Sequence, residues 1–161
     1  MLFRSVLVKV SHPLPPDWER QETRNDDSVV AELRWHDVSF VFTGDIEAAA
    51  EREIGDSFGP APLRVVKVPH HGSQTSSSEG FLRRLHPQVA VISVGRSNGF
   101  GHPSPRVVER YRSLGIAAFR TDRDGAVFVD TDGTRLDFRT FTGGARSFVD
   151  RKSTRLNSSH V

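Results

Sequence analysis

Two apolar segments of this chain run directly into side chains that bind metals, and this feature constrains the fold more than any other. The first segment, Leu63 to Val68, is followed by Pro69-His70-His71-Gly72-Ser73. The second, Val38 to Phe42, is followed by Thr43-Gly44-Asp45. Short apolar runs bounded by turn residues are typical of buried strands, and in α/β proteins functional groups collect where strands end. We therefore expect Asp45 and the histidine pair to lie together at one edge of a sheet.

Each of these side chains also has a structural explanation that must be weighed. Asp45 precedes Ile46 to Ile54, a segment of helical composition, and for an isolated aspartate a helix cap is the more common role. Two adjacent imidazoles in a Pro-His-His-Gly turn have no comparable packing purpose, so we favour a functional role for at least one of His70 and His71. His102, in a loop after another apolar run, fits a turn residue and a substrate contact equally well.

The composition limits the kinds of metal site and partner. None of the 161 residues is cysteine, so a metal ion would be held by histidine, aspartate, glutamate or water. The formal charge of +2 becomes −1 when Arg151, Lys152 and Arg155 are set aside, and composition thus gives no argument for a polyanionic partner. No apolar run approaches the roughly 20 residues that cross a bilayer, so we expect the chain as given to be soluble.

The order of the elements predicts a sheet layered with helices. Strands are expected at 6–10, 28–35, 38–42, 63–68, 89–94, 116–120, 125–130 and 135–141, and helices at 46–54, from Ser76 to Leu85 and from Ser104 to Gly115. In the second helix, Ser76 and Glu79 match a capping box, and in the third, Pro105 follows a capping Ser104. We interpret this order as one domain of mixed α/β class.

Several motifs, taken in order, resemble one protein family. They are Arg24 to Val30, Thr43-Gly44-Asp45-Ile46, Val68 to Ser73, Ser93-Val94-Gly95 with Asn98 and Gly101-His102-Pro103, and Arg120-Thr121-Asp122 with Gly125. The set looks like the C-terminal metallo-β-lactamase-like domain of ComEC-type competence proteins, the inner-membrane channels that import DNA as a single strand. The resemblance implies a partial domain at 6–141, with 1–5 and 151–161 as non-native or disordered ends.

The same resemblance implies a fold and a set of site residues. The fold is the C-terminal half of an αββα sandwich with a metal site at one edge. Asp45 is implied as the carboxylate that bridges two cations, zinc or manganese. His71 is favoured as a metal ligand and His70 as the residue facing the substrate, with the reverse assignment left open. Asn98 and His102 match a motif near the mouth of the site that would contact the scissile phosphate.

The activity implied by the resemblance is hydrolysis of phosphodiester bonds in the DNA strand that is not imported. The parent protein would lie in the bacterial inner membrane with this domain on the extracytoplasmic side. Its implied partners are DNA, the rest of the membrane channel and other DNA-uptake proteins.

One departure from the family pattern changes the expectation for the chain by itself. The fold takes most of its ligands from a His-x-His-x-Asp-His motif in its first half, and this sequence contains no such cluster. We therefore expect a fragment that begins after that motif and is inactive alone. Two other hypotheses remain: a free-standing hydrolase of the same fold that acts on another phosphodiester or ester, and a degenerate module that binds DNA or a partner without chemistry.

Overall fold

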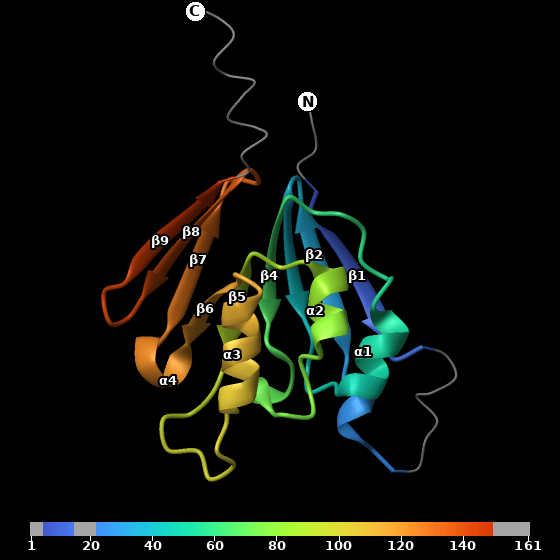
Figure 1. Ribbon diagram of the computed structural model, residues 1–161. Helices are drawn as coiled ribbons and strands as arrows, with labels where there is room; N and C mark the ends of the chain where they lie inside the picture. Colours follow the sequence, from blue (N-terminus) through green and yellow to red (C-terminus); the bar gives the residue numbers. More distant parts are fainter. Residues whose placement is uncertain (1–4, 15–21, 150–161) are drawn as a thin grey trace, which may run out of the picture.

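The chain folds into three layers, with helices on one face of a large sheet and a small sheet on the other (Figure 1). The computed structural model describes residues 5–14 and 22–149. The large sheet contains, in spatial order, β1 (Leu7–His12), β2 (Val30–Trp35), β3 (Val38–Phe42), β4 (Leu63–Lys67), β5 (Val89–Ile92) and β6 (Ala117–Arg120). The small sheet contains β7 (Val127–Thr131), β8 (Arg135–Thr140) and β9 (Ala145–Val149). The predicted mixed α/β class is confirmed.

Strand direction divides the large sheet into two parts. β2 pairs antiparallel with both β1 and β3, and a tight turn at His36 and Asp37 joins β2 to β3. From β3 to β6 every neighbouring pair is parallel. These strands are joined through the helices α1 (Ala48–Ile54), α2 (Glu79–Leu85) and α3 (Pro105–Ser113). The carboxyl ends of β3 to β6 therefore meet at one edge, the lower one in Figure 1.

Two apolar cores explain why several strands are continuously apolar in sequence. One core lies between the large sheet and the helices and contains Val66, Phe81 and Tyr111. The other lies between the two sheets and contains Val65 and Phe138. Strands such as β4 are covered on both faces, so consecutive valines enter different cores and the alternation expected of a half-exposed strand is absent.

A buried ion pair lies within the helix-facing side of the large sheet. Nη2 of Arg64 on β4 is 3.4 Å from Oε1 of Glu32 on β2, and the two side chains are only 3% and 5% exposed. Arg64 also donates hydrogen bonds to the Ser39 hydroxyl and to the carbonyl oxygens of Gly59 and Leu85. Burial lowers the pKa of the Arg64 guanidinium, and the Glu32 carboxylate opposes that shift. The pair therefore depends on several oxygen acceptors to compensate for lost hydration.

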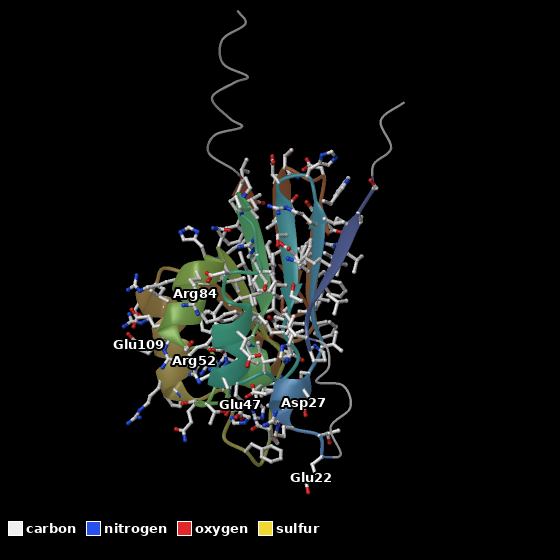
Figure 2. The ribbon with its side chains drawn as sticks, turned by 90° about the vertical axis from the view of Figure 1, so that its right-hand side faces the viewer. Glu22, Asp27, Glu47, Arg52, Arg84 and Glu109 are labelled. Carbon is white, nitrogen blue, oxygen red and sulfur yellow. The ribbon has the colours of Figure 1, made fainter. Side chains whose placement is uncertain are left out.

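The outer surface of the helical layer is polar. Arg52 of α1, Arg84 of α2 and Glu109 of α3 are exposed and lie on this side of the molecule (Figure 2). Within residues 5–14 and 22–149, no helix combines the length and the apolar character that a membrane span requires.

The predicted role of Asp45 as a helix cap is wrong. α1 begins after Glu47, two residues further along the chain. Ile46 lies between them and is fully buried in the helix-facing core, so the chain enters the core before the helix starts. The Asp45 carboxylate faces Lys67 and His71 instead.

The capping residue predicted for α2 is also wrong by two positions. The N-cap is Ser78, whose hydroxyl accepts a hydrogen bond from the Phe81 N–H at 3.4 Å. Glu51 of α1, itself fully buried, accepts hydrogen bonds from the N–H groups of Ser77 and Ser78. This contact fixes the approach to α2, and Ser76 instead donates its hydroxyl to carbonyl groups of the preceding turn.

Within the described residues, four elements are additional to those expected from the sequence, one of them the 3-10 helix η3 (Pro69–Gly72). Asn25–Asp27 forms the 3-10 helix η2 and Thr121–Asp124 forms the single-turn helix α4. β9 pairs antiparallel with β8 and lies beyond position 141, where the expected domain ends. Of the ends expected to be non-native or disordered, only Ser5 lies within the described residues.

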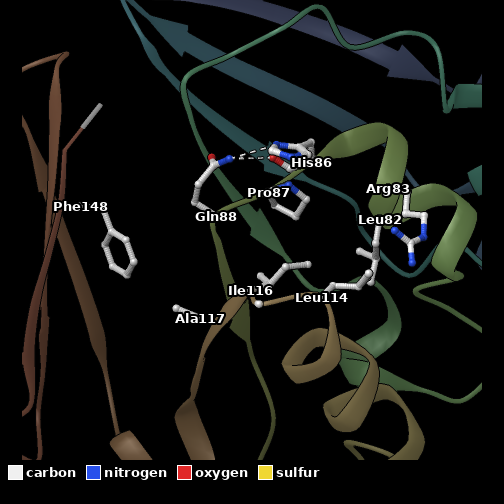
Figure 3. Close-up of a pocket in the computed structure, with 10 residues that line it drawn as sticks. Leu82, Arg83, His86, Pro87, Gln88, Leu114, Ile116, Ala117 and Phe148 are labelled. Carbon is white, nitrogen blue, oxygen red and sulfur yellow. Dashed lines mark hydrogen bonds between the residues drawn. The ribbon is translucent and has the colours of Figure 1, made fainter. Parts of the chain in front are cut away.

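A pocket of about 510 Å³ lies away from the edge where the parallel strands end. It opens between the ends of α2 and α3, the start of β6, and Phe148 of β9 (Figure 3). Leu82, Ile116 and Phe148 give it apolar walls. Its position at the amino ends of β5 and β6 separates it from the residues that the sequence singled out.

Candidate metal centre

The parallel pairing of β3 and β4 brings Asp45 and the histidines to one edge. Phe42 and Lys67, the last residues of the two strands, are direct partners across the sheet. The segments that follow, Thr43 to Asp45 and Pro69 to Gly72, therefore leave the sheet side by side. The predicted proximity of the Asp45 carboxylate to the histidine pair is confirmed for His71, which lies 3.6 Å from it.

The histidine pair occupies an unusual backbone conformation. His70 and His71 lie in the 3-10 helix η3 (Pro69–Gly72) with φ values of 45° and 53°, in the left-handed region. Each such residue other than glycine costs about 1 to 2 kcal/mol, and strain of this kind concentrates at functional sites. The turn is held by hydrogen bonds from His70 N–H to Gly44 O at 3.2 Å and from Ser104 N–H to Gly72 O at 2.8 Å.

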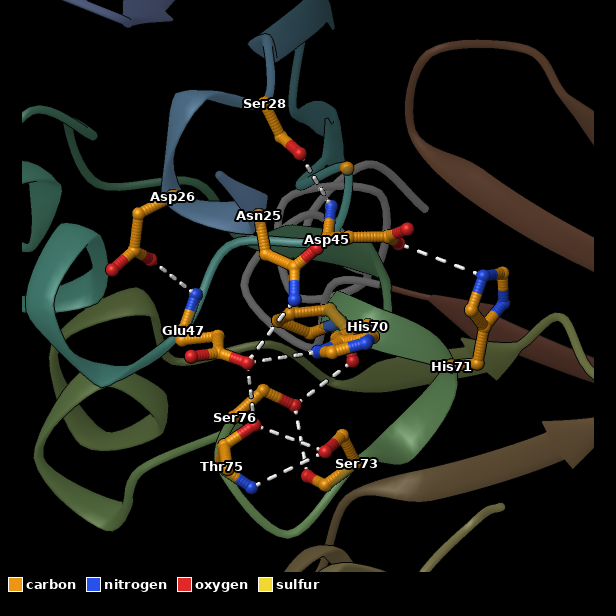
Figure 4. A network of polar contacts seen from close by, with 12 residues as sticks. Asn25, Asp26, Ser28, Asp45, Glu47, His70, His71, Ser73, Thr75 and Ser76 are labelled. Atoms are coloured by element: carbon orange, nitrogen blue, oxygen red, sulfur yellow. Dashed lines mark hydrogen bonds and ion pairs between the residues drawn. The ribbon is translucent and has the colours of Figure 1, made fainter. Parts of the chain in front are cut away.

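His71 directs one imidazole nitrogen toward Asp45. Its Nε2 is 3.6 Å from Asp45 Oδ1, and its Nδ1 is 2.6 Å from the carbonyl oxygen of Ser93 at the end of β5. A carbonyl accepts only, so Nδ1 donates to Ser93 O, and Nε2 is the nitrogen that faces the Asp45 carboxylate (Figure 4). A supporting hydrogen bond of this type is usual for histidines that bind metals.

Lys67, which sequence patterns did not identify as a site residue, contacts the same carboxylate. Lys67 Nζ is 3.4 Å from Asp45 Oδ1 and donates to Gly44 O at 2.8 Å. The side chains of Lys67 and Asp45 are 23% and 39% exposed. Asp45 Oδ1 is thus contacted by both the Lys67 ammonium group and the His71 imidazole, so charged and polar groups gather at this edge of the sheet.

His70 is paired with a second carboxylate, Glu47. Its Nδ1 is 3.2 Å from Glu47 Oε1. Nδ1 is buried and makes no hydrogen bond of acceptable geometry. The Glu47 oxygen therefore does not lie along the N–H direction of the ring. The contact is therefore an electrostatic pairing, and it places His70 on the opposite side of the turn from the Asp45–His71 contact (Figure 4).

Glu47 is itself held in place by neighbouring polar groups. Its Oε1 accepts hydrogen bonds from the Thr75 hydroxyl at 2.9 Å and from Asn25 Nδ2 at 3.3 Å, and its N–H donates to Asp26 Oδ1 at 2.6 Å. The Thr75 hydrogen bond is the main cause that lowers the pKa of Glu47, with Asn25 and His70 acting in the same direction. In the sequence, the only feature that points to Glu47 as a site residue is an acidic side chain two positions after Asp45.

The loop between β5 and α3 brings His102 to the site and uses Asn98 as a brace. The His102 ring contacts the His70 ring edge to face at 5.7 Å between centroids. Burial, followed by the nearby His70 and His71, lowers the pKa of His102. Both amide hydrogens of Asn98 are donated within the loop, to Gly95 O and His102 O, and its Oδ1 accepts from the His102 N–H. The phosphate contact predicted for Asn98 stays a prediction.

The donors at this edge fit part of a metal site. A carboxylate and an imidazole are ligands that zinc and manganese accept. A protein zinc site normally has three or four protein ligands. In the described part of the chain, no group of three or more His, Cys, Asp or Glu side chains is arranged to hold an ion. The described residues therefore bring together two suitable donor side chains, Asp45 and His71, which are fewer than a complete site requires.

Comparison with protein families agrees with this geometry. A family model described as the metallo-beta-lactamase superfamily matches residues 7–96, which include Asp45, His70 and His71. The chain belongs to the metallo-beta-lactamase superfamily. Members of this superfamily typically bind divalent metal ions, so the chemistry of the two donors and the family agree.

Curated proteins similar to this chain include three ComEC-type competence proteins. ComE operon protein 3 of Bacillus subtilis is 34% identical over 72% of this chain, competence protein ComA of Neisseria gonorrhoeae is 35% identical over 71%, and recombination protein 2 of Haemophilus influenzae is 38% identical over 63%. The matched parts are only 15%, 17% and 13% of the lengths of these relatives. The chain therefore corresponds to one part of each relative.

Proposed function

We propose that this chain supplies one side of a divalent-metal centre that hydrolyses phosphodiester bonds of DNA in a DNA-uptake protein. The observation that carries the proposal is the 3.6 Å separation of Asp45 Oδ1 and His71 Nε2, with the other imidazole nitrogen held by a backbone carbonyl. The similarity to competence proteins supports DNA as the substrate. The remaining ligands would come from a histidine-rich motif outside the described residues.

In this proposal the two histidines of the turn have different roles. Asp45 and His71 would hold the divalent metal. A bound divalent ion lowers the pKa of a water ligand and stabilises charge on a phosphoryl oxygen. His70 faces the substrate, and the Glu47 carboxylate orients its ring so that Nε2 is the atom available to exchange a proton. His102 contacts the scissile phosphate from the loop that Asn98 braces.

The parent protein is proposed to be a channel of the bacterial inner membrane with this domain on the extracytoplasmic side. In that setting the domain cuts the DNA strand that is not imported. Its partners are DNA, the remainder of the channel and other DNA-uptake proteins.

Titration of the chain with zinc or manganese is expected to show weak binding of one ion. Two protein donors should give a dissociation constant of roughly 0.1 mM, compared with nanomolar or tighter values for complete sites. We expect Asp45→Asn and His71→Gly to abolish this binding when it is measured by isothermal titration calorimetry. Glycine is chosen at His71 because it accepts the positive φ.

Two controls accompany the titration. His86 is exposed, lies in the left-handed region and is remote in sequence from the site, so His86→Asn should leave binding unchanged. Tight stoichiometric binding together with DNA cleavage by the chain alone would show that the described residues form a complete centre, contrary to the proposal.

A chimera tests the nuclease assignment directly. We expect ComE operon protein 3 that carries this chain in place of its matching segment to cleave DNA in the presence of zinc or manganese. Asp45→Asn or His71→Gly in the chimera should lower the cleavage rate by at least about 100-fold, because each removes a ligand of the reacting ion. His86→Asn serves again as the control. If both site variants cleave as the unmodified chimera does, the module that binds DNA without chemistry becomes the better hypothesis.

A further inference from the structure

Phe100, at the tip of the loop between β5 and α3, is 84% exposed. Figure 1 shows this loop projecting beyond the helices at the end of the molecule where β3, β4 and β5 terminate. A single exposed apolar residue on a protein surface needs no special explanation. Phe100 differs from such residues because its loop is braced by hydrogen bonds and its ring contacts the His102 ring.

The loop that carries Phe100 is braced from within and fixed at both ends. Asn98 makes three hydrogen bonds across it, to Gly95 O and to both backbone groups of His102. At its start, Ser93 O accepts from His71 Nδ1, and at its end, Ser104 N–H donates to Gly72 O. The exposed ring is therefore held in a defined position relative to the histidine turn.

A line of contacting rings connects Phe100 to the candidate centre. The Phe100 ring stacks on the His102 ring, with 6.0 Å between centroids and an interplanar angle of 19°. His102 in turn contacts His70 at 5.7 Å. His102 supports one face of the Phe100 ring, and the high exposure of Phe100 leaves the ring accessible from solvent.

We propose that Phe100 is a stacking platform for an unpaired nucleobase adjacent to the scissile phosphate at His70 and His102. The inference rests on the proposed nuclease function and adds the substrate class, which is single-stranded or locally unpaired DNA. Bases within a duplex are already stacked on their neighbours, whereas an unpaired base offers a free face to an aromatic side chain. Such stacking tolerates any base.

Charge in the same loop favours this occupant over an apolar protein surface. Arg96 is exposed, and its Nε donates to the Asp122 carbonyl at 3.3 Å. Lys67 at the edge of the site is a second cationic side chain, and binding to a phosphate backbone requires positive charge. The binding experiment below also distinguishes DNA from a protein partner at Phe100.

Binding measured without metal separates stacking from catalysis. The probe is a fluorescein-labelled oligo-dT of about 12 nucleotides, and a matched strand with abasic sites lacks the stacking groups. We expect Phe100→Ala to weaken binding of the base-bearing strand about 10-fold at one fixed salt concentration, with EDTA present. Phe100→Trp should retain the affinity, and wild-type protein should bind the abasic strand about as weakly as the alanine variant binds oligo-dT.

Phe141 provides a matched control, since it is 79% exposed in the turn after β8, on the small sheet. Phe141→Ala is expected to bind as the wild type does. In Phe100→Trp, oligo-dT should quench the new tryptophan emission and the abasic strand should not, whereas Phe141→Trp should respond to neither.

Three results would overturn the stacking platform. They are no measurable binding of oligo-dT, equal affinity of wild type and Phe100→Ala, and equal affinity for the base-bearing and abasic strands. The second result would assign the exposed ring to a protein contact. Because EDTA removes metal, these outcomes are independent of cleavage: a chimera that fails to cleave while the stacking results hold contradicts the nuclease function alone.

Discussion

Replacing Gly72 with alanine is expected to lower the free energy of unfolding by about 3 kcal/mol and to displace the histidine turn. Gly72 has a φ of +83°, and a Cβ built on it would lie 2.6 Å from Pro103 Cβ and 3.2 Å from Pro103 Cα. The proline ring and its backbone cannot move aside as a flexible side chain would. The loop must shift, and the Ser104 N–H to Gly72 O hydrogen bond is then lost.

Substitution of a second glycine separates the two causes of the lost stability, which are the positive φ and the contact with Pro103. Gly115 has a φ of +72°, and its added Cβ would have no heavy atom within 4 Å. Gly115→Ala should therefore show only the backbone cost of about 1 kcal/mol. Urea denaturation of both variants measures the difference, and equal losses would mean that the contact with Pro103 contributes nothing.

Substitution of Arg64 by methionine is expected to cost about 3 to 5 kcal/mol of unfolding free energy, because it leaves the Glu32 carboxylate buried without a cationic partner. The carbonyl oxygens of Gly59 and Leu85 also lose a donor. A domain of this size is typically stable by only about 5 to 15 kcal/mol. The variant should thus unfold at a much lower urea concentration than the wild type.

A double substitution shows whether the cost comes from the stranded charge. Glu32→Gln combined with Arg64→Met removes both charges, and we expect it to be more stable than Arg64→Met alone. Arg112 pairs with Glu109 on the exposed face of α3, so Arg112→Met should leave the denaturation midpoint unchanged. If the double variant is no more stable than the single one, lost packing rather than the unpaired carboxylate explains the effect.

Sequence patterns located the central strands of the large sheet, β3, β4 and β5, because burial on both faces leaves a strong apolar signal. β3 was predicted with the bounds observed, Val38–Phe42, and β4 and β5 were predicted within two residues of their ends. β9 carried a weaker signal, since Ala145–Val149 is largely exposed and alternates little. The single turn of α4 is too short for periodicity to detect.

Helix starts were predicted less well, because contacts with other elements determine them. Asp45 and Ser76 are both suitable capping residues in sequence, yet the helices begin at later positions. The burial of Ile46 delays α1, and the side chain of Glu51 fixes the backbone before α2. Neither cause is local to the residue that was expected to cap.

The sequence by itself determined the strand-to-turn transitions that carry Asp45, His70 and His71, because apolar runs and turn residues are local signals. Which nitrogen of each imidazole faces which carboxylate depends on tertiary contacts. The Ser93 carbonyl holds Nδ1 of His71, and Glu47 contacts Nδ1 of His70; both come from segments distant in the chain from the histidine turn. Parallel pairing across the sheet sets such contacts, and no local pattern of residues encodes the direction of a side chain across it.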